Sequence, residues 1–356
     1  MSTSARFSER PNFEHPEAGR LLDAALREGP AHAYLFHGPP GVGKREVART
    51  FARALIGTTR VVHPDLYELD ALGEMIRIDA IRELRRDLHM RPFESDRRVY
   101  LLHHAHLMNE DAADALLKDL EEPPSYAVIV LIADDLGPLP ETILSRCQLV
   151  PFRRLSEKVI RELVDARAPQ LDEESRAALA RVAAGRLDRL ERLLEPASVA
   201  RREALIDQAR AVYRDPLFDA SDAAAAVLAN AQERATEARD LEEANIAGLE
   251  LTAREAEQRV KRAARGAERE ELLAQLEELG AWYRDLMAVA VGAESAAIHL
   301  DKLPELREDA TRERLIGAEH AADAVRETWR ALEELNLAPQ LAFEALFIRI
   351  GRELPA

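Results

Sequence analysis

The stretch HGPPGVGKREVART, from His37 to Thr50, decides the fold of this chain. Gly38, Gly43 and Lys44 stand where the phosphate-binding pattern G-x-x-x-x-G-K-[ST] requires them. The last position is Arg45, which has no hydroxyl to hold a magnesium ion beside the phosphates. The candidate nucleotide-binding residues are Gly38, Pro39, Pro40, Gly41, Val42, Gly43, Lys44 and Arg45. Whether Lys44 still binds a nucleotide is left open by these residues.

The segments around this loop predict a parallel α/β domain. AYLFHG (33–38) reads as a buried strand, and the residues after the loop have helical spacing and end at Gly57. RRVYLLHHAH (97–106) and YAVIVLIAD (126–134) are two further buried strands. Between them, a helix begins after the capping residue Asn109 and stops before Pro123. Strands that alternate with helices imply a parallel sheet.

The chain after Pro151 is predicted to be helical. Residues 156–212 give short helices broken by APQLD (168–172) and by Gly185, and the remainder is helical to the end. The Glu- and Arg-rich stretch 232–271 lacks proline and keeps apolar residues, which favours long exposed helices over disorder.

Composition excludes several classes of protein. A net charge of -16 argues against autonomous binding to the DNA backbone or to acidic membranes. The single cysteine, Cys147, excludes an internal disulfide and a Cys-rich zinc module. No apolar run reaches membrane-spanning length, so a cytoplasmic location and no membrane partner are expected.

The strand predicted over 97–106 lacks the residues that ATP hydrolysis needs. A phosphate-loop enzyme needs one carboxylate for magnesium and one to orient water, and this strand offers His103 and His104 instead. Imidazole is a poor magnesium ligand, because that ion prefers hard oxygens. Neighbouring strand residues face opposite sides, so His103, His104 and His106 are not expected to form a metal site. We therefore expect no metal in this chain and no ATP hydrolysis by it.

Four segments in order, HGPPGVGK, HPDLYEL (63–69), VYLLHHAHLMNEDAADALLKDLEEPP (99–124) and LPETILSRC (139–147), resemble the clamp-loader branch of the AAA+ family. WYRDLMAVAVGAE (282–294) and the C-terminal LNLAPQLAFEALFIRIGREL (335–354) resemble the helical collar of that family. The resemblance implies a RecA-like α/β domain over 1–152, a helical lid over 153–213 and a helical collar over 214–356. Many relatives carry a zinc module before HPDLYEL, but ALIGTTRVVHPD (54–65) has no cysteine, so no zinc is expected.

The resemblance also implies roles for two arginines. In such loaders the Arg of the SRC motif reaches the ATP of the next subunit as an arginine finger, and that role carries over to Arg146. Arg189 is a weaker match to the lid arginine that senses the nucleotide. Arg45, His103 and His104 replace the residues of the motor subunits, so no cofactor is required and any ATP or ADP is expected to bind weakly.

The implied partners are the motor ATPase subunits and the delta subunit in a hetero-pentameric ring. The sliding clamp and primer-template DNA would be reached through this complex, which belongs to the DNA polymerase III holoenzyme. Two alternatives compete with a non-hydrolysing subunit. One is an ATP-hydrolysing motor subunit or another AAA+ ATPase, and the other is a nucleotide-responsive binding protein unrelated to replication.

Overall fold

The computed structural model describes residues 7, 15–70, 75–247, 253–334 and 337–354. The chain divides into two compact units. The first unit holds the described residues up to Ala166 together with Gly185–Arg189, and the second holds Arg167–Ala184 and the described residues from Leu190 onward. The division falls inside two helices, α6 (Glu157–Arg167) and α8 (Leu187–Leu194). The predicted three-domain boundaries stay a prediction.

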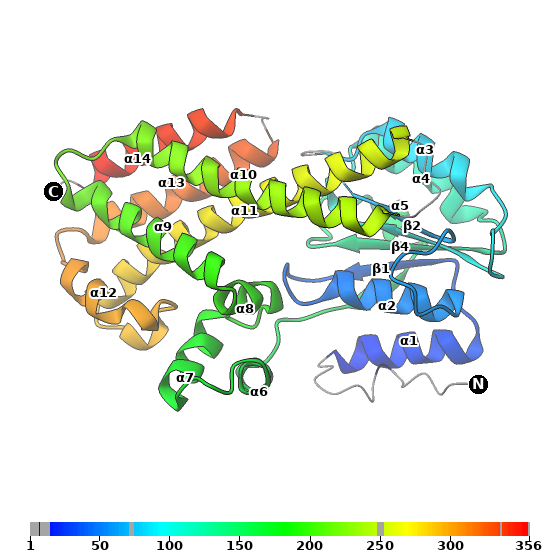
Figure 1. Ribbon diagram of the computed structural model, residues 1–356, viewed down its shortest axis with the longest axis horizontal. Helices are drawn as coiled ribbons and strands as arrows, with labels where there is room; N and C mark the ends of the chain where they lie inside the picture. Colours follow the sequence, from blue (N-terminus) through cyan, green and yellow to red (C-terminus); the bar gives the residue numbers. More distant parts are fainter. Residues whose placement is uncertain (1–6, 8–14, 71–74, 248–252, 335–336, 355–356) are drawn as a thin grey trace. The chain divides into compact units, whose positions relative to one another are not determined.

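The first unit is an α/β domain around a five-stranded sheet in which every paired strand is parallel (Figure 1). Its elements are α1 (Pro16–Glu28), β1 (Ala33–His37), α2 (Lys44–Ile56), β2 (Leu66–Leu69), α3 (Ile78–Leu88), β3 (Arg98–Leu102), a 3-10 turn (Ala105–Leu107), α4 (Glu110–Glu121), β4 (Ala127–Ala133), α5 (Glu141–Leu144) and β5 (Gln148–Pro151). The strand order is β2-β3-β4-β1-β5, so β1 lies between β4 and β5, and the glycine-rich loop follows its C-terminal end. The prediction of a parallel sheet is confirmed.

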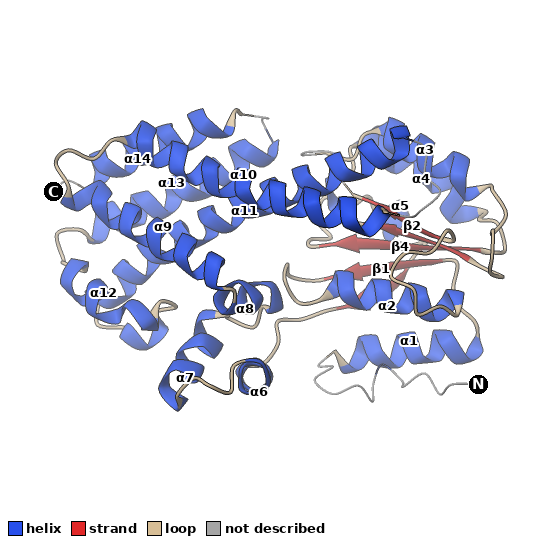
Figure 2. Cartoon of the chain, in the orientation of Figure 1, coloured by secondary structure: helices blue, strands red, loops and turns tan. Residues whose placement is uncertain are grey.

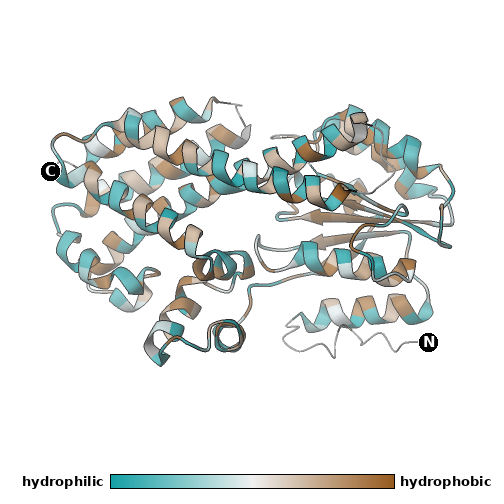
Figure 3. Ribbon diagram, in the orientation of Figure 1, coloured by the Kyte–Doolittle hydropathy of each residue, from teal (hydrophilic) through white to brown (hydrophobic). Residues whose placement is uncertain are grey.

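The sheet is covered by helices on both faces, and the strands are apolar on both (Figure 3). Tyr34, Phe36 and alternate residues of the other strands pack with α1 and α2, whereas Leu35 and its neighbours pack with α3 and α4. Side chains of successive strand residues point to opposite faces, so a strand buried on both faces reads as a continuous apolar run. That is why AYLFH and AVIVLIA could be identified as strands from sequence.

The ends of several elements follow from single residues. The Asn109 side chain accepts a hydrogen bond from Ala112 N and begins α4, as predicted. Gly57 takes the left-handed conformation that ends α2, also as predicted. The strand expected over 97–106 is shorter, however, because β3 ends at Leu102. His104 has a φ of 52° and turns the chain into the 3-10 turn, which ends the sheet pairing.

The described part of the chain after β5 consists of helices and loops (Figure 2). Its helices are α6, α7 (Glu173–Val182), α8, α9 (Pro196–Arg214), α10 (Ala220–Ile246), α11 (Ala253–Ala290), α12 (Leu303–Asp309), α13 (Leu315–Glu334) and α14 (Pro339–Glu353), with 3-10 turns at Glu294–Ala296 and Leu300–Lys302. The long helices predicted over 232–271 are confirmed for 232–246 and 253–271, and 248–252 lie outside the described residues. α9 is longer than the short helices expected before residue 212.

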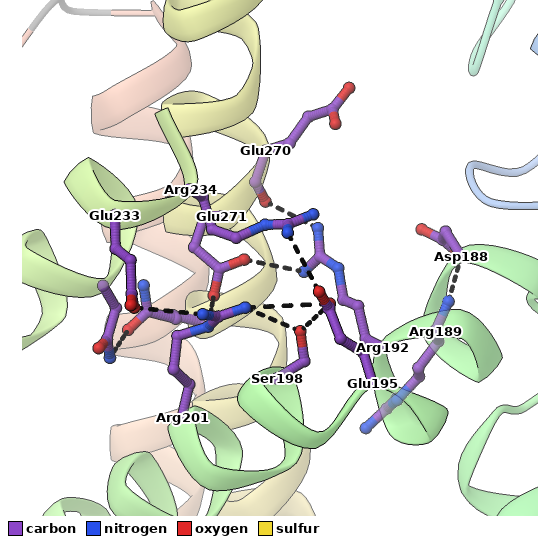
Figure 4. Close-up of polar contacts among 12 residues, drawn as sticks. Asp188, Arg189, Arg192, Glu195, Ser198, Arg201, Glu233, Arg234, Glu270 and Glu271 are labelled. Atoms are coloured by element: carbon purple, nitrogen blue, oxygen red, sulfur yellow. Dashed lines mark hydrogen bonds and ion pairs between the residues drawn. The ribbon is translucent and has the colours of Figure 1, made fainter. Parts of the chain in front are cut away.

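The second unit has its own core, in which α9 to α14 pack around Trp282, Tyr283, Phe343 and Phe347. A polar network around the buried Arg201 joins three of these helices (Figure 4). Arg201 of α9 lies 2.9 Å from Ser198 Oγ, 3.2 Å from Glu233 of α10 and 4.0 Å from Glu271 of α11. A buried cation is tolerated only when it is paired, so removing its partners would destabilise this unit. Among the described residues, no helix is both long and apolar enough to cross a membrane.

Candidate functional site

The glycine-rich loop joins β1 to α2, as the sequence predicted. Gly38, Gly41 and Gly43 have φ values of 140°, 72° and 91°, a region that residues with a Cβ rarely adopt. A Cβ on Gly38 would also lie 2.1 Å from the carbonyl oxygen of Phe152, so only glycine fits there. The loop therefore keeps the backbone path that aims successive N–H groups at an anion.

Lys44 is buried and has a partner for each of its three ammonium hydrogens. Its Nζ donates to the carbonyl oxygens of Gly38 and Pro39, at 2.6 and 2.5 Å, and lies 2.7 Å from Asp134 Oδ1. Burial lowers the pKa of Lys44, and the Asp134 carboxylate opposes that shift. Asp134 follows β4 directly, and the Lys44 charge holds the pKa of Asp134 low against the effect of burial. A ligand phosphate would have to take Lys44 from these partners.

The position that would carry the magnesium-binding hydroxyl is occupied by a cation. Arg45 Nη2 lies 2.7 Å from His104 Nε2 and 3.5 Å from Asp70 Oδ2. His104 Nδ1 lies 2.8 Å from Asp70 Oδ1, so the three side chains form a closed cluster. Burial would raise the pKa of Asp70, but the hydrogen bond from His104 and the nearby charge of Arg45 hold it well below its usual range. The carboxylate at this end of β2 is thus already paired within the protein.

A second cluster lies beside the first. Glu68 of β2 accepts hydrogen bonds from Arg49 of α2 and from His103 Nε2, the latter at 2.9 Å. Burial would raise the pKa of Glu68, but these hydrogen bonds outweigh it and lower the pKa to about 2. Burial lowers the pKa of His103, which keeps its imidazole neutral with the proton on Nε2. His103 and His104 therefore bind different carboxylates, Glu68 and Asp70. Both histidines lie beyond the end of β3, so the alternation of side chains along a strand is not the reason for their divergence.

These residues do not fit a magnesium ion. Magnesium needs hard oxygen ligands in octahedral geometry, and the carboxylates here, Glu68 and Asp70, are engaged by Arg49, His103, His104 and Arg45. Among the residues that the structure describes, no group of three or more His, Cys, Asp or Glu side chains is placed to hold a metal.

Arg146 lies between α5 and β5, where the sequence placed the SRC motif. Its Nε donates to Glu121 Oε1 at 2.9 Å, and Nη2 donates to the same oxygen. Its Nη1 donates to Thr142 O at 2.9 Å and to Ser145 Oγ at 3.2 Å. One third of the Arg146 side chain is exposed, so the guanidinium is at the surface yet held by the last turn of α4. It is not part of the cluster around Lys44.

Sequence reasoning did not find several residues that the fold brings to the phosphate loop. Asp134 could have been found, because it directly follows an apolar strand. Arg186 and Asp188 lie against Gly41, whereas the lid arginine expected from the resemblance was Arg189. Arg189 is buried in α8, and its backbone N–H donates to Asp188 Oδ1 at 2.8 Å. The sensing role of Arg189 stays a prediction.

The parallel sheet, the glycine-rich loop after its inner strand β1 and the helical remainder define the class of the protein. The chain has a RecA-like AAA+ α/β fold followed by helical regions. Residues 15–156, fewer than half of the chain, match the model of the family described as DNA polymerase III, delta subunit. The part of the chain that carries the loop is thus similar to clamp-loader subunits of DNA polymerase III.

Individual relatives come from more than one kind of subunit. DNA polymerase III subunit tau of Bacillus subtilis is 32% identical over 201 residues, which cover 51% of this chain and 35% of that protein. Subunit delta' of the same organism is 32% identical over 168 residues, 42% of this chain and 51% of that protein. The chain therefore spans between a third and a half of the length of these relatives. A gamma subunit-related protein from Thermotoga maritima has a similar solved structure, with 19% identity, a TM-score of 0.45, and coverage of 94% of this chain and 99% of that one.

Proposed function

We propose that the chain acts in DNA replication as a delta-prime-like, non-hydrolysing subunit of the sliding-clamp loader of DNA polymerase III. It holds its place in a hetero-pentameric ring with motor ATPase subunits and a delta subunit, and it supplies Arg146 to the ATP of a neighbouring subunit. The chain itself has neither ATPase nor polymerase activity, and it acts in the cytoplasm. The sliding clamp and primer-template DNA meet it within the complex.

One observation carries this proposal. The carboxylates of Asp70 and Glu68, at the end of β2, are bonded to cations and imidazoles of the chain itself. Asp70 is bound to Arg45 and His104, and Glu68 is bound to Arg49 and His103. Neither is left to bind magnesium or to orient an attacking water, and hydrolysis needs both. Arg146, by contrast, needs no nucleotide in its own subunit in order to act on a neighbour.

The chemistry of Arg146 suits this role. A guanidinium placed against the γ-phosphate stabilises the charge that spreads over the transferring phosphoryl group. An arginine supplied in trans accelerates hydrolysis by about 10³ to 10⁵ at the site it serves. Because other sites of a ring keep their own arginines, we expect replacement of Arg146 to leave part of the total activity.

The test uses the reconstituted complex. Arg146→Ala is expected to assemble normally and to lower DNA-stimulated ATP hydrolysis and clamp loading. Arg146→Lys is expected to rescue poorly, because an ammonium does not reproduce the planar fork of the guanidinium. Arg91→Ala, which removes an exposed arginine elsewhere in the first unit, is the matched control. Clamp loading by Arg146→Ala at the wild-type rate would refute the trans role.

The alternative function is an ATP-hydrolysing motor subunit. The intact glycines and Lys44 of the loop favour it, because they are the parts that a motor also needs. The isolated chain distinguishes the two functions, since a motor subunit would release phosphate from ATP in a reaction that Lys44→Ala abolishes.

A further inference from the structure

A short segment of the first unit, Gly185–Arg189, lies directly on the phosphate loop. Leu187 N donates to the carbonyl oxygen of Gly41 at 2.7 Å, and Leu155 N donates to that of Gly185 at 3.0 Å. A Cβ built on Gly41 would lie 1.9 Å from Asp188 Oδ1 and 2.8 Å from Arg186 Nε. A carboxylate and a guanidinium are therefore in contact with the glycine at the centre of the loop.

These two charged side chains are bound to each other. Arg186 Nη2 donates to Asp188 Oδ2 at 2.6 Å, and Arg186 Nε donates to Asp188 Oδ1 at 3.1 Å. This is the bidentate geometry in which a guanidinium also binds phosphate. Arg186 is largely buried, with 11% of its side chain exposed, so its orientation toward the loop is set by packing as well as by charge.

The Asp188 carboxylate also acts on the loop lysine. Burial is the largest influence on the pKa of Lys44 and lowers it, while the charge of Asp188 is close enough to raise it, in the same direction as Asp134. The negatively charged carboxylate of Asp188 thus lies beside the loop, Lys44 and Arg186, which all favour binding of an anion.

We propose that Asp188 is a built-in competitor for phosphate at this loop, and that a nucleoside di- or triphosphate binds by displacing the Asp188 carboxylate from Arg186. In the bound form Arg186 and Lys44 are the two side-chain cations that hold the polyphosphate. This goes beyond the proposed function, because it concerns binding at the chain's own loop and requires neither hydrolysis nor Arg146. No covalent bond is made or broken, because a phosphate group only replaces the Asp188 carboxylate as the anion that Arg186 binds.

The physical consequence is a low affinity that one substitution relieves. Asp188→Asn removes the competing charge, keeps the size of the side chain and removes the carboxylate that Arg186 binds in place of phosphate. One additional charge-assisted hydrogen bond corresponds to a gain in affinity of about 10- to 100-fold. The gain requires both cations, so it should vanish when either Arg186 or Lys44 is replaced in the Asp188→Asn background.

The test measures binding of fluorescently labelled ADP to the full chain, with unlabelled ATP and inorganic tripolyphosphate as competitors. EDTA is present, so that magnesium complexes of the ligands do not contribute. We expect Asp188→Asn to bind about 10- to 100-fold more tightly than the wild type. Asp188→Asn/Arg186→Ala and Asp188→Asn/Lys44→Ala are expected to lose that gain. Glu191→Gln, which removes an exposed carboxylate one turn further along α8, is the matched control and is expected to bind as the wild type does.

Two outcomes would overturn the proposal. One is an Asp188→Asn variant that keeps its melting temperature and binds no more tightly than the wild type. The other is a gain for ADP and ATP without a gain for tripolyphosphate, because the change would then concern the base or ribose. If Asp188→Asn does not fold, Arg186→Ala decides the matter. Weaker tripolyphosphate binding than in the wild type supports the exchange on Arg186, and unchanged binding refutes it.

Discussion

The guanidinium of Arg146 is bound by the carboxylate of Glu121, with two of its nitrogens on one oxygen of that residue. Glu121 is the last residue of α4, where the negative end of the helix dipole also favours a cation. An arginine that serves a neighbouring subunit must leave this position. The pair is exposed, with about half of the Glu121 side chain in solvent, so leaving it costs only about 0.2–1 kcal/mol.

Glu121→Gln should therefore release Arg146 without unfolding the chain. We expect the free energy of unfolding to change by less than about 1 kcal/mol. ATP hydrolysis by the reconstituted complex should stay equal or rise by at most about 5-fold, the factor that corresponds to that energy. The double variant Glu121→Gln/Arg146→Ala should behave as Arg146→Ala alone. Hydrolysis that falls in Glu121→Gln would mean that Glu121 positions the arginine and does not restrain it.

Lys44 should matter for stability and not for hydrolysis by the isolated chain. Lys44→Ala leaves Asp134 and two loop carbonyl oxygens without their shared donor, which should cost about 1–3 kcal/mol. Urea denaturation measures this cost, with Lys118→Ala on the surface of α4 as the control. Phosphate release from ATP should remain at background in both the wild type and Lys44→Ala. A wild-type rate above background that Lys44→Ala removes would instead favour a motor subunit.

His299 predicts a dependence of stability on pH in the second unit. It is fully buried, with Nδ1 2.7 Å from Asp285 Oδ2 and Nε2 2.9 Å from Glu278 Oε1. Burial would lower the pKa of His299, but the hydrogen bonds to Asp285 and Glu278 raise it above its ordinary value of 6.5. The folded state therefore holds the proton more tightly than the unfolded state. The stabilisation is fully present below about pH 6.5 and is lost as the pH rises through the folded-state pKa.

The measurement is urea denaturation between pH 6 and pH 9, with an NMR titration of the imidazole. The wild type should lose stability over the range in which His299 titrates. The exposed His320, which pairs with Glu353, provides the control, since His320→Gln should leave the pH profile unchanged. A His299 pKa at or below 6.5 would contradict the prediction.

The apolar runs and glycines of the sequence suffice to predict the sheet and the loop, because a strand buried on both faces and a positive-φ turn each leave a local pattern. The two clusters of charged and histidine side chains beside the loop leave no such local pattern in the sequence. Arg45 meets His104 across 59 residues, and Glu68 meets His103 across 35, so their pairing depends on the strand order. The place of β2 beside β3 brings the carboxylates to the histidines, and nothing near either residue in the sequence indicates it.

The contact of Asp188 with the loop is another that the sequence alone does not indicate. The resemblance predicts the lid arginine at Arg189, and that role stays a prediction. The residues that the turn after Gly185 brings to Gly41 are Arg186 and Asp188. The side of α8 that faces the loop is held by long-range contacts, among them the backbone hydrogen bond from Leu187 N to Gly41 O. A shift of a single residue changes the chemistry from a cation to an anion, so sequence spacing alone could not assign it.

The outer face of α14 should be the part of the second unit that binds partner subunits. Leu341 and Ile348 are exposed by 58% and 47%, and they lie seven residues apart, on one side of the helix. The opposite side, with Phe343 and Phe347, is buried in the unit's own core. Deleting the chain from Trp329 onward would therefore abolish assembly by destroying that core, and it would say little about the contact surface.

A double variant, Leu341→Glu/Ile348→Glu, separates the two effects. Both side chains are exposed, so each substitution should change the free energy of unfolding by no more than about 0.5 kcal/mol. Co-elution with the partner subunits should nevertheless be lost, because two charges would be buried in an apolar contact. Leu217→Glu, at a position that is 89% exposed before α10, is the control and should still co-elute. Normal co-elution of the double variant would exclude this face of α14 from the ring contact.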